Sequence, residues 1–283
     1  MIRYAAKIDH PYLKALWQEV FGDPKEAVDA YFALRHKDEN MLVEVFEGTV
    51  AGMLTMLPVT LSSSRGDFPA RYIYAVATAP AFRNRGISTR LLDYAHLEMQ
   101  KKGEAAAILV PATPSLFDFY GKRGYQTAFA LNILHLSAAS LPPFPENSRI
   151  EPCSSGEYAR LRDAAFVKSR LYARWNTSDI RYAMETFGEA GGVTKLSLGR
   201  GEGCAAWERQ GDGVLIRELA LAGMDIPTAV SLLHGQLGAS GYTLRLMEGS
   251  FAGAETQPFG MIRWLIAEPE LAGAPPYLSL ALD

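Results

Sequence analysis

The stretch from Ile73 to Met99 constrains the fold more than any other part of the chain. An apolar, β-favouring run from Ile73 to Thr78 stops at Pro80, and a short basic loop with Gly86 follows. Apolar residues then recur at helical spacing: Ile87, Leu91, Leu92, Ala95 and Met99. The sequence therefore predicts a strand, a basic loop and a helix in direct succession.

The loop between this strand and this helix suits an anionic ligand. The first N–H groups of a helix have no partner inside the helix and can bind anionic oxygen. Gly86 allows close approach of the backbone and a positive φ, while Arg83 and Arg85 add positive charge beside those donors. We therefore expect a phosphorylated ligand at this loop.

A second informative segment lies downstream, from Ala105 to Tyr125. The unalternating apolar run Ala105–Val110 is typical of a strand buried on both faces, and strand, helix and strand of this length imply a parallel crossover. Thr113 and Pro114 suit the N-cap and first residue of a short helix. Together with a hairpin predicted before Ile73, the pattern indicates a mixed central sheet.

Two motifs in this region resemble the GNAT superfamily of acyl-CoA-dependent N-acyltransferases. Arg83-x-x-Gly86-x-Ser88 is similar to the family's Arg/Gln-x-x-Gly-x-Gly/Ala loop, with Ser88 where Gly or Ala is usual. Phe119-Tyr120-x-x-x-Gly124-Tyr125 resembles the Phe-Tyr-x-x-x-Gly-Phe/Tyr segment and lies one strand and one helix later, as in that family. The resemblance implies a GNAT fold for about residues 1 to 136.

The resemblance also implies acetyl-CoA as the co-substrate and assigns roles to residues. The backbone of Val76 and Thr78 would pair with the pantetheine arm, and the Val76 N–H would polarise the thioester carbonyl. Tyr120 would be the general acid that protonates the leaving sulfur, because a Tyr hydroxyl is a donor at neutral pH. The pyrophosphate would be bound by Arg83, Arg85, Gly86, Ile87 and Ser88.

The general base is left open by the sequence. Many relatives carry a Glu on the strand before the loop, whereas this strand reads Arg71-Tyr72-Ile73-Tyr74-Ala75. A water chain, the carboxylate of Glu19 or Asp29, and the terminal carboxylate at Asp283 are the alternatives. The five histidines are scattered and form no metal-ligand cluster or Ser-His-Asp order, so we expect no metal.

The second half of the chain is predicted to repeat the plan of the first. Residues 139–150 contain three prolines and read as a stiff linker. Beyond it, capping signals begin helices near Ser154 and Ser178, and three strands, a helix from Asp225 and two strands follow. The predicted strands are Val193–Leu198, Cys204–Arg209, Val214–Leu221, Tyr242–Met247 and Met261–Ile266. No Arg-x-x-Gly-x-Gly loop precedes the Asp225 helix, which indicates a degenerate second domain.

We therefore predict an α/β chain with mixed sheets in two domains. Residues 1–138 would form a catalytic GNAT acyl-CoA-binding domain, and residues 151–283 a degenerate GNAT-like domain. That tandem arrangement resembles the Eis-like acetyltransferases, and Trp175-Asn-Thr-Ser-Asp and Phe259-Gly-Met-Ile are similar to segments of their second domain. Those relatives carry a further sterol-carrier-like domain, for which 283 residues leave no room. We expect the second half to form the wall of the cleft on the side that receives the acceptor. The sequence leaves open whether the chain forms a homo-oligomer.

Composition argues against several other classes of protein. With 28 basic and 31 acidic residues the net charge is −3, so neither nucleic acid nor an anionic membrane is an expected partner. Cys153 and Cys204 form no metal-type spacing and read as free thiols of a reducing compartment. No apolar run reaches the roughly 20 residues that span a bilayer, and charge interrupts the N-terminus too early for a signal peptide. We expect a cytoplasmic protein.

The expected activity is transfer of an acetyl group from acetyl-CoA to a primary amine by direct attack. The acceptor would be a small molecule or a lysine-like peptide group, which the sequence does not identify further. A non-catalytic acyl-CoA-binding sensor or scaffold is the alternative, kept open by Ser88 and the missing strand Glu. Another nucleotide-binding fold is disfavoured because no Walker-type Lys-Ser/Thr or Rossmann triple glycine is present.

Overall fold

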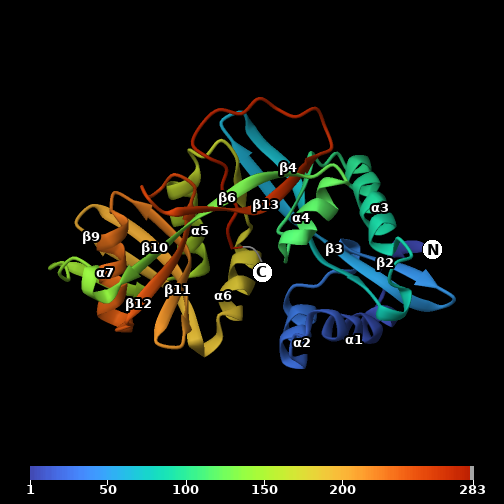
Figure 1. Ribbon diagram of the computed structural model, residues 1–283, viewed down its shortest axis with the longest axis horizontal. Helices are drawn as coiled ribbons and strands as arrows, with labels where there is room; N and C mark the ends of the chain where they lie inside the picture. The colour runs from blue at the N-terminus through green and yellow to red at the C-terminus, as the bar shows by residue number, and fades with distance from the viewer. Residues whose placement is uncertain (281–283) are drawn as a thin grey trace. The chain divides into compact units, whose positions relative to one another are not determined.

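The computed structural model describes residues 1–280, with the backbone alone for Glu189. By internal contacts the chain divides into two compact units (Figure 1). Unit 1 comprises Met1–Thr60, Phe68–Gln126 and Met261–Pro269, and unit 2 comprises 61–67, 127–260 and the chain from Glu270 onward. The predicted domain boundaries at 138 and 151 stay a prediction about folding units. No helix within residues 1–280 has the length and apolar content needed to cross a membrane.

Unit 1 is built on a mixed sheet with the strand order β1-β2-β3-β4-β5-β13. The strands are β1 (Ile2–Tyr4), β2 (Met41–Phe46), β3 (Thr49–Ser63), β4 (Gly66–Thr78), β5 (Ala106–Leu109) and β13 (Glu255–Trp264). Strands β1, β2 and β3 pair in antiparallel fashion, whereas β4 and β5 are parallel. The predicted mixed sheet is therefore confirmed.

Unit 1 contains four helices. They are α1 (His10–Phe21), α2 (Lys25–Leu34), α3 (Ile87–Lys101) and α4 (Pro114–Gly121). Gly22 ends α1 with φ +76, and Thr113 and Pro114 are the N-cap and first residue of α4. These positions depend on local backbone preferences, which the sequence displays directly.

Two aspartates that precede helices α1 and α2, Asp9 and Asp23, do not cap them. Asp9 binds the Arg3 guanidinium at 2.6 and 2.9 Å, and Asp23 accepts a hydrogen bond from Trp17 Nε1 at 2.7 Å. Helix α2 therefore begins after Pro24, with no side-chain cap. The Asp9 carboxylate also accepts a hydrogen bond from the Ala6 N–H at 2.9 Å, so its partners precede α1 in the chain.

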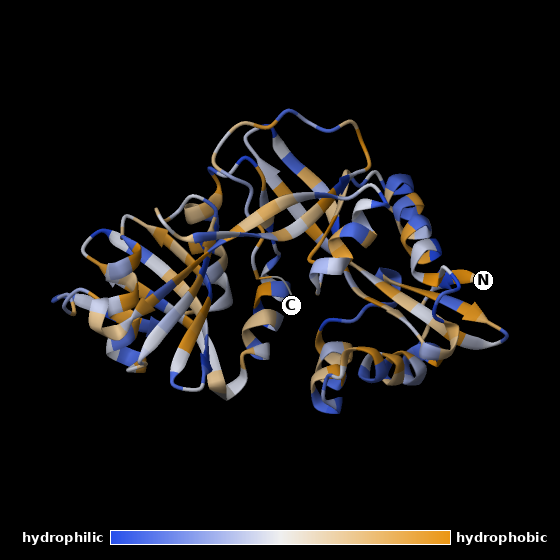
Figure 2. Ribbon diagram, viewed as in Figure 1, coloured by the Kyte–Doolittle hydropathy of each residue, from blue (hydrophilic) through white to orange (hydrophobic). Residues whose placement is uncertain are grey.

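Helix α3 packs its apolar face on the sheet of unit 1. Ile87, Leu91, Leu92, Ala95 and Met99 are all buried in one cluster with strand residues such as Leu54 and Ile73. The opposite side of α3 is hydrophilic (Figure 2). Gly52 on β3 permits this close packing, because a Cβ there would lie 2.6 Å from Ile87 Cγ2 and 2.9 Å from the Ala77 carbonyl oxygen.

Residues Met261–Trp264 of strand β13 belong to unit 1, although the sequence pattern assigned this strand to the second domain. Its residues Met261–Trp264 pair antiparallel with Ala106–Leu109 of β5. The prediction of a strand at Met261–Ile266 is confirmed, although the strand spans Glu255–Trp264. The choice of its neighbouring strand depends on which strand edge is unpaired in the folded chain. Apolar alternation specifies a strand and its buried face, not its neighbour.

Unit 2 has the strand order β13-β6-β12-β11-β10-β9-β7. Its strands are β6 (Gln126–Ser137), β7 (Ser148–Pro152), β8 (Tyr172–Arg174), β9 (Gly191–Leu198), β10 (Gly201–Gln210), β11 (Gly213–Ala222) and β12 (Gly241–Met247). Its helices are α5 (Ser155–Phe166), α6 (Thr177–Thr186) and α7 (Ile226–Leu237). Strands β11 and β12 are parallel, as β4 and β5 are in unit 1.

The capping signals of unit 2 are mostly confirmed. Ser154 and Glu157 form the predicted capping box, and Asp225 accepts a hydrogen bond from the Thr228 N–H at 2.8 Å. Helix α6 begins two residues earlier than predicted, because Asn176 rather than Ser178 is its N-cap. Residues 148–152 form β7 against β9, so the end of the predicted linker belongs to a strand.

The chain beyond Glu270 packs against the far part of β11. Pairing of β11 with β12 runs from Gly213 to Ile216, and the next carbonyl, that of Arg217, accepts a hydrogen bond from Ser279 Oγ at 3.2 Å. Trp175 Nε1 donates to the Ser279 carbonyl oxygen at 3.1 Å. The end of the described chain thus lies beside β11 where its pairing with β12 stops.

Candidate active site

Strand β4 departs from regular geometry just before the predicted site. It pairs with β5 in parallel from Ala70 to Tyr72, whereas the strand itself continues to Thr78. Ala75 has φ +48, a left-handed conformation that residues with a side chain rarely adopt. Such an irregularity bends a strand and redirects the residues that follow. Val76 and Thr78, the predicted pantetheine-binding positions, come directly after it and are half-buried.

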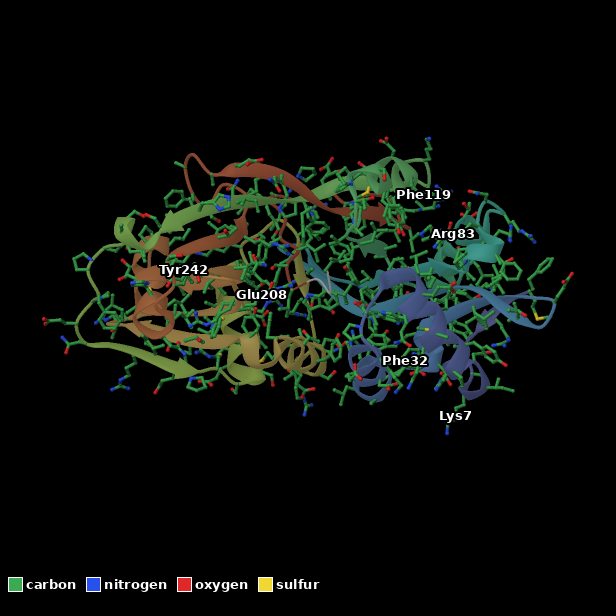
Figure 3. All side chains as sticks on the ribbon, turned by 60° about the horizontal axis from the view of Figure 1, so that its bottom comes forward. Lys7, Phe32, Arg83, Phe119, Glu208 and Tyr242 are labelled. Carbon is green, nitrogen blue, oxygen red and sulfur yellow. The ribbon has the colours of Figure 1, made fainter. Side chains whose placement is uncertain are left out.

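The predicted pyrophosphate loop has the backbone that its glycine indicated. After the short turn Pro80–Phe82, Asn84 has φ +61 and Gly86 has φ +71, and Gly86 is the N-cap of α3. Arg83, which is labelled in Figure 3, is exposed, as are Arg85 and Gly86. Ile87 is buried by its side chain, so that its contribution to a ligand would come from the backbone.

The amide groups at the start of α3 are unpaired within residues 1–280. The N–H groups of Gly86, Ile87 and Ser88 donate to no protein acceptor in that part of the chain, and the first helical bond runs from the Arg90 N–H to the Gly86 carbonyl oxygen at 3.0 Å. Three adjacent free donors at a helix N-terminus form a binding position for anionic oxygen.

The Arg85 side chain is held by aromatic contacts. Its guanidinium lies 5.4 Å from the centre of the Phe82 ring and 5.9 Å from that of Phe46. The two rings contact each other edge to face at 5.8 Å. Cation–π contacts restrict the guanidinium without neutralising its charge, so Arg85 stays available to an anion.

Tyr120 lies near the end of α4 with 8% of its surface exposed. Burial raises the pKa of its phenol to about 12, against an opposing effect of the Arg123 charge. Its ring contacts Phe119 at 5.1 Å and Tyr125 at 5.6 Å between centroids. Within residues 1–280 its hydroxyl forms no hydrogen bond, so at neutral pH it is a protonated donor free to bind a ligand.

Arg123, which the sequence analysis did not single out, joins the helix of Tyr120 to the loop helix. Its guanidinium donates to Thr89 Oγ1 in the first turn of α3 and to the Phe119 carbonyl oxygen at 2.6 Å. It also stacks 3.5 Å above the centre of the Phe119 ring (Phe119 is labelled in Figure 3). The structure therefore brings the start of α3 and helix α4 together.

A second set of residues contacts Tyr120 through the ring of Tyr125. His96 Nε2 is 2.8 Å from Tyr125 Oη, and both side chains are buried. Burial, with a smaller effect of the Arg263 charge, lowers the pKa of His96 to about 3, and burial raises the pKa of Tyr125 well above its usual range. Only the motif residue Tyr125 had a sequence signal. His96 had merely its place on the apolar face of α3.

Comparison with known families agrees with this geometry. Residues 1–128 match the family model described as the acetyltransferase (GNAT) domain. They are a GNAT acetyltransferase domain. The strand, loop and helix order of the GNAT domain, its mixed sheet and its acyl-transferring enzyme class are those that the sequence predicted.

Solved structures support the same fold over nearly the whole chain. A GCN5-related N-acetyltransferase from Anabaena variabilis is 18% identical, with a TM-score of 0.76 over 94% of this chain and 73% of its own. One from Kribbella flavida is 18% identical, with a TM-score of 0.73 over 93% and 70%. Eis1 from Mycobacterium abscessus is 15% identical, with a TM-score of 0.71 over 94% and 74%. At these identities the likeness concerns the fold alone. No curated protein sequence matches the chain.

One cluster in the GNAT domain has the side chains of a metal site, although the sequence analysis found none. His10 Nε2 and His36 Nε2 lie 2.7 and 2.8 Å from the same oxygen of Asp38. Ligands around a tetrahedral metal ion, with bonds of about 2.0 Å, stand about 3.3 Å apart. The shorter separations are hydrogen-bond lengths, so His10, Asp38 and His36 form a hydrogen-bonded cluster that ties α1 to the chain after α2.

The carboxylates considered as general base differ in their surroundings. Asp29 binds Lys14 at 2.7 Å and Lys25 at 2.5 Å, and these hydrogen bonds lower its pKa to about 2. A carboxylate held in that way is a weak proton acceptor. Glu19 is exposed on α1, and Asp283 lies outside the described residues. The base therefore remains unassigned.

Proposed function

We propose that the protein is an acetyl-CoA-dependent N-acetyltransferase that acts on a primary amine. One observation carries the proposal. The free N–H groups of Gly86, Ile87 and Ser88 lie at the start of α3. The Arg123 guanidinium donates to Thr89 in the first turn of α3 and to Phe119 in α4, the helix that carries the Tyr120 phenol. An anion-binding position and an acid are thus held in one unit, as transfer from a phosphorylated thioester requires.

The co-substrate would bind with its charged end at the loop. The three amides, with Arg83 and Arg85, suit a diphosphate, since charge-assisted hydrogen bonds to phosphate are strong. The pantetheine arm would lie along β4 after the irregularity at Ala75, where it would pair with the backbone of Val76 and Thr78. Positioning of this kind removes much of the entropic cost of a reaction between two molecules.

The reaction begins with attack of a neutral amine on the thioester carbonyl carbon. The new C–N bond places negative charge on the carbonyl oxygen, which the Val76 N–H stabilises. The C–S bond then breaks, and Tyr120 gives its proton to the departing sulfur. A phenol with a pKa of about 12 keeps that proton at neutral pH until the thiolate forms. The excess proton of the amine leaves to solvent or to the unassigned base, and a proton taken up from solvent restores the Tyr120 phenol.

Unit 2 is proposed to lack an acyl-CoA site of its own. In unit 1 the parallel pairing of β4 with β5 ends at Tyr72, and the pantetheine arm would lie beyond that point. In unit 2 the pairing of β11 with β12 ends at Ile216, and the chain around Ser279 lies beside β11 beyond that point. We take the acceptor to be a small-molecule amine or a peptide amine. One molecule of CoA per chain is the expected stoichiometry.

Thiol release from acetyl-CoA across a panel of small amines and lysine peptides tests the proposal. Calorimetry with CoA measures binding separately from turnover. We expect binding of one CoA per chain and amine-dependent thiol release. Binding without thiol release would favour the non-catalytic acyl-CoA-binding alternative, and absence of binding would reject both.

A further inference from the structure

Arg90 contacts the loop from beneath, one turn into α3. Its Nη1 donates to the Arg85 carbonyl oxygen at 2.7 Å, and its backbone N–H donates to the Gly86 carbonyl oxygen at 3.0 Å. Two successive carbonyls of the loop are thus bound by one residue. The Arg90 guanidinium also lies close to Gly86 itself, since a Cβ built on Gly86 would be 3.4 Å from Arg90 Nη1.

These two bonds determine where the neighbouring amides point. In a planar trans peptide the C=O and the following N–H lie on opposite sides of the chain. With the Arg85 carbonyl turned toward Arg90, the Gly86 N–H faces away from the helix. The same holds for the Gly86 carbonyl and the Ile87 N–H. The Arg90 side chain therefore sets the direction of the Gly86 N–H, whereas the first backbone bond of α3, from the Arg90 N–H, sets that of the Ile87 N–H.

Glu44 on β2 fixes Arg90 in turn. One of its carboxylate oxygens accepts from Arg90 Nη2 at 2.6 Å and from Nε at 3.1 Å. The Glu44 side chain is 8% exposed and that of Arg90 49%. The second carboxylate oxygen of Glu44 is buried and has no hydrogen-bond partner in residues 1–280. Arg90 is the cation that forms an ion pair with this carboxylate.

We propose that Glu44 and Arg90 are positioning residues of the diphosphate loop, an inference that rests on the proposed function. Glu44 holds the Arg90 guanidinium, Arg90 holds the Arg85 carbonyl inward, and the Gly86 N–H is thereby presented to the diphosphate before it arrives. A preformed donor set binds more tightly because the ligand does not have to order it. The Glu44–Arg90 pair itself need not touch the ligand.

Two conservative variants test this inference. Arg90→Lys keeps a cation beside Glu44 but loses the planar fork that reaches the carboxylate and the Arg85 carbonyl together, and Glu44→Gln keeps the shape but loses the charge. We expect each to weaken CoA binding in calorimetry about tenfold or more, and to raise KM for acetyl-CoA with little change in kcat. Arg200→Lys, at an exposed turn of unit 2, is the matched control.

Acetylpantetheine, which has the thioester and no diphosphate, separates positioning from general damage. If the pair acts through the loop, both variants should use acetylpantetheine as well as the wild type does. Unchanged CoA affinity in both variants, or an equal loss with both thioesters, would overturn the inference. Failure of the wild-type protein itself to bind CoA would instead reject the proposed function.

Discussion

Nη1 of Arg263 lies 3.0 Å from Nδ1 of His96, and the same nitrogen donates to the Arg123 carbonyl oxygen at 2.8 Å. Because arginine has donors only, Nδ1 of His96 is the acceptor and its proton is on Nε2. That proton is then donated to Tyr125 Oη. A residue of the last strand therefore holds both the histidine and the carbonyl that follows the helix of Tyr120.

This arrangement should make folding sensitive to acid through His96. The pKa of His96 is about 3 in the folded chain and about 6.5 in an unfolded one. Between these values the unfolded chain binds one more proton. The free energy of unfolding should therefore fall as the pH falls, by up to about 1.4 kcal/mol per pH unit from this group.

His96→Gln tests that prediction in denaturant titrations between about pH 4 and 7. The variant should be less stable than the wild type at pH 7 and should lose stability less steeply toward pH 4. His135→Gln, at an exposed histidine of β6, is the control and should keep the wild-type slope. Equal slopes for the wild type and His96→Gln would show that His96 does not titrate in this way.

Tyr120→Phe should reduce kcat by about 10² to 10⁴, the range that a general acid supplies. KM for acetyl-CoA should change little, because the loop and β4 are untouched. The change removes a hydroxyl with no hydrogen-bond partner in residues 1–280, so the melting temperature should stay close to that of the wild type. Steady-state thiol release measures both constants. Tyr94→Phe, at a half-buried tyrosine of α3, is the control, and wild-type turnover in Tyr120→Phe would reject the role of the phenol.

Gly86→Ala should raise KM for acetyl-CoA. A side chain at φ +71 is strained by about 1–2 kcal/mol, and its Cβ would lie 3.4 Å from Arg90 Nη1. Gly48→Ala is the matched control, because Gly48 has φ +80 in the β2–β3 turn with no atom near its Cβ position. Both variants should lose similar stability, but only Gly86→Ala should change KM. A KM increase in both would assign the effect to general strain.

Arg162→Met should destabilise unit 2 by about 3–5 kcal/mol, because it leaves a buried carboxylate without its partner. Arg162 and Glu218 are fully buried and joined by two hydrogen bonds, of 2.6 and 3.1 Å. Arg160→Met is the control, since Arg160 is largely exposed on the same helix. Guanidinium titration compares the free energies of unfolding. The double variant with Glu218→Leu should recover part of the loss, and no recovery would argue against an uncompensated charge as its cause.

A chain ended after Leu136 should fail to fold as a stable GNAT domain. It lacks β13, whose residues Met261–Trp264 cover one edge of β5. Without β13, strand β5 becomes an edge strand with unpaired backbone N–H and C=O groups, which favours aggregation. Circular dichroism and size-exclusion chromatography of this fragment provide the test, with the full chain as the control. A soluble, cooperatively folding fragment would contradict the prediction.

The amino-acid sequence by itself determined the features that depend on neighbouring residues. Gly86 takes the left-handed conformation and begins α3, Gly22 ends α1, and Ser154 with Glu157 begins α5. Each of these follows from backbone preferences and first-turn hydrogen bonding, which act within a few residues. The motif around Gly86 and Tyr120 was readable for the same reason.

Only the tertiary structure decided which distant residues meet. The placement of β13 beside β5, the contact of Arg263 with His96, and the Glu44–Arg90 pair join segments between 46 and 167 residues apart. Many charged and apolar residues of this chain could form such contacts equally well as isolated pairs. The partner is selected by which strand edge and which buried group the whole fold leaves unsatisfied, and no local pattern records that.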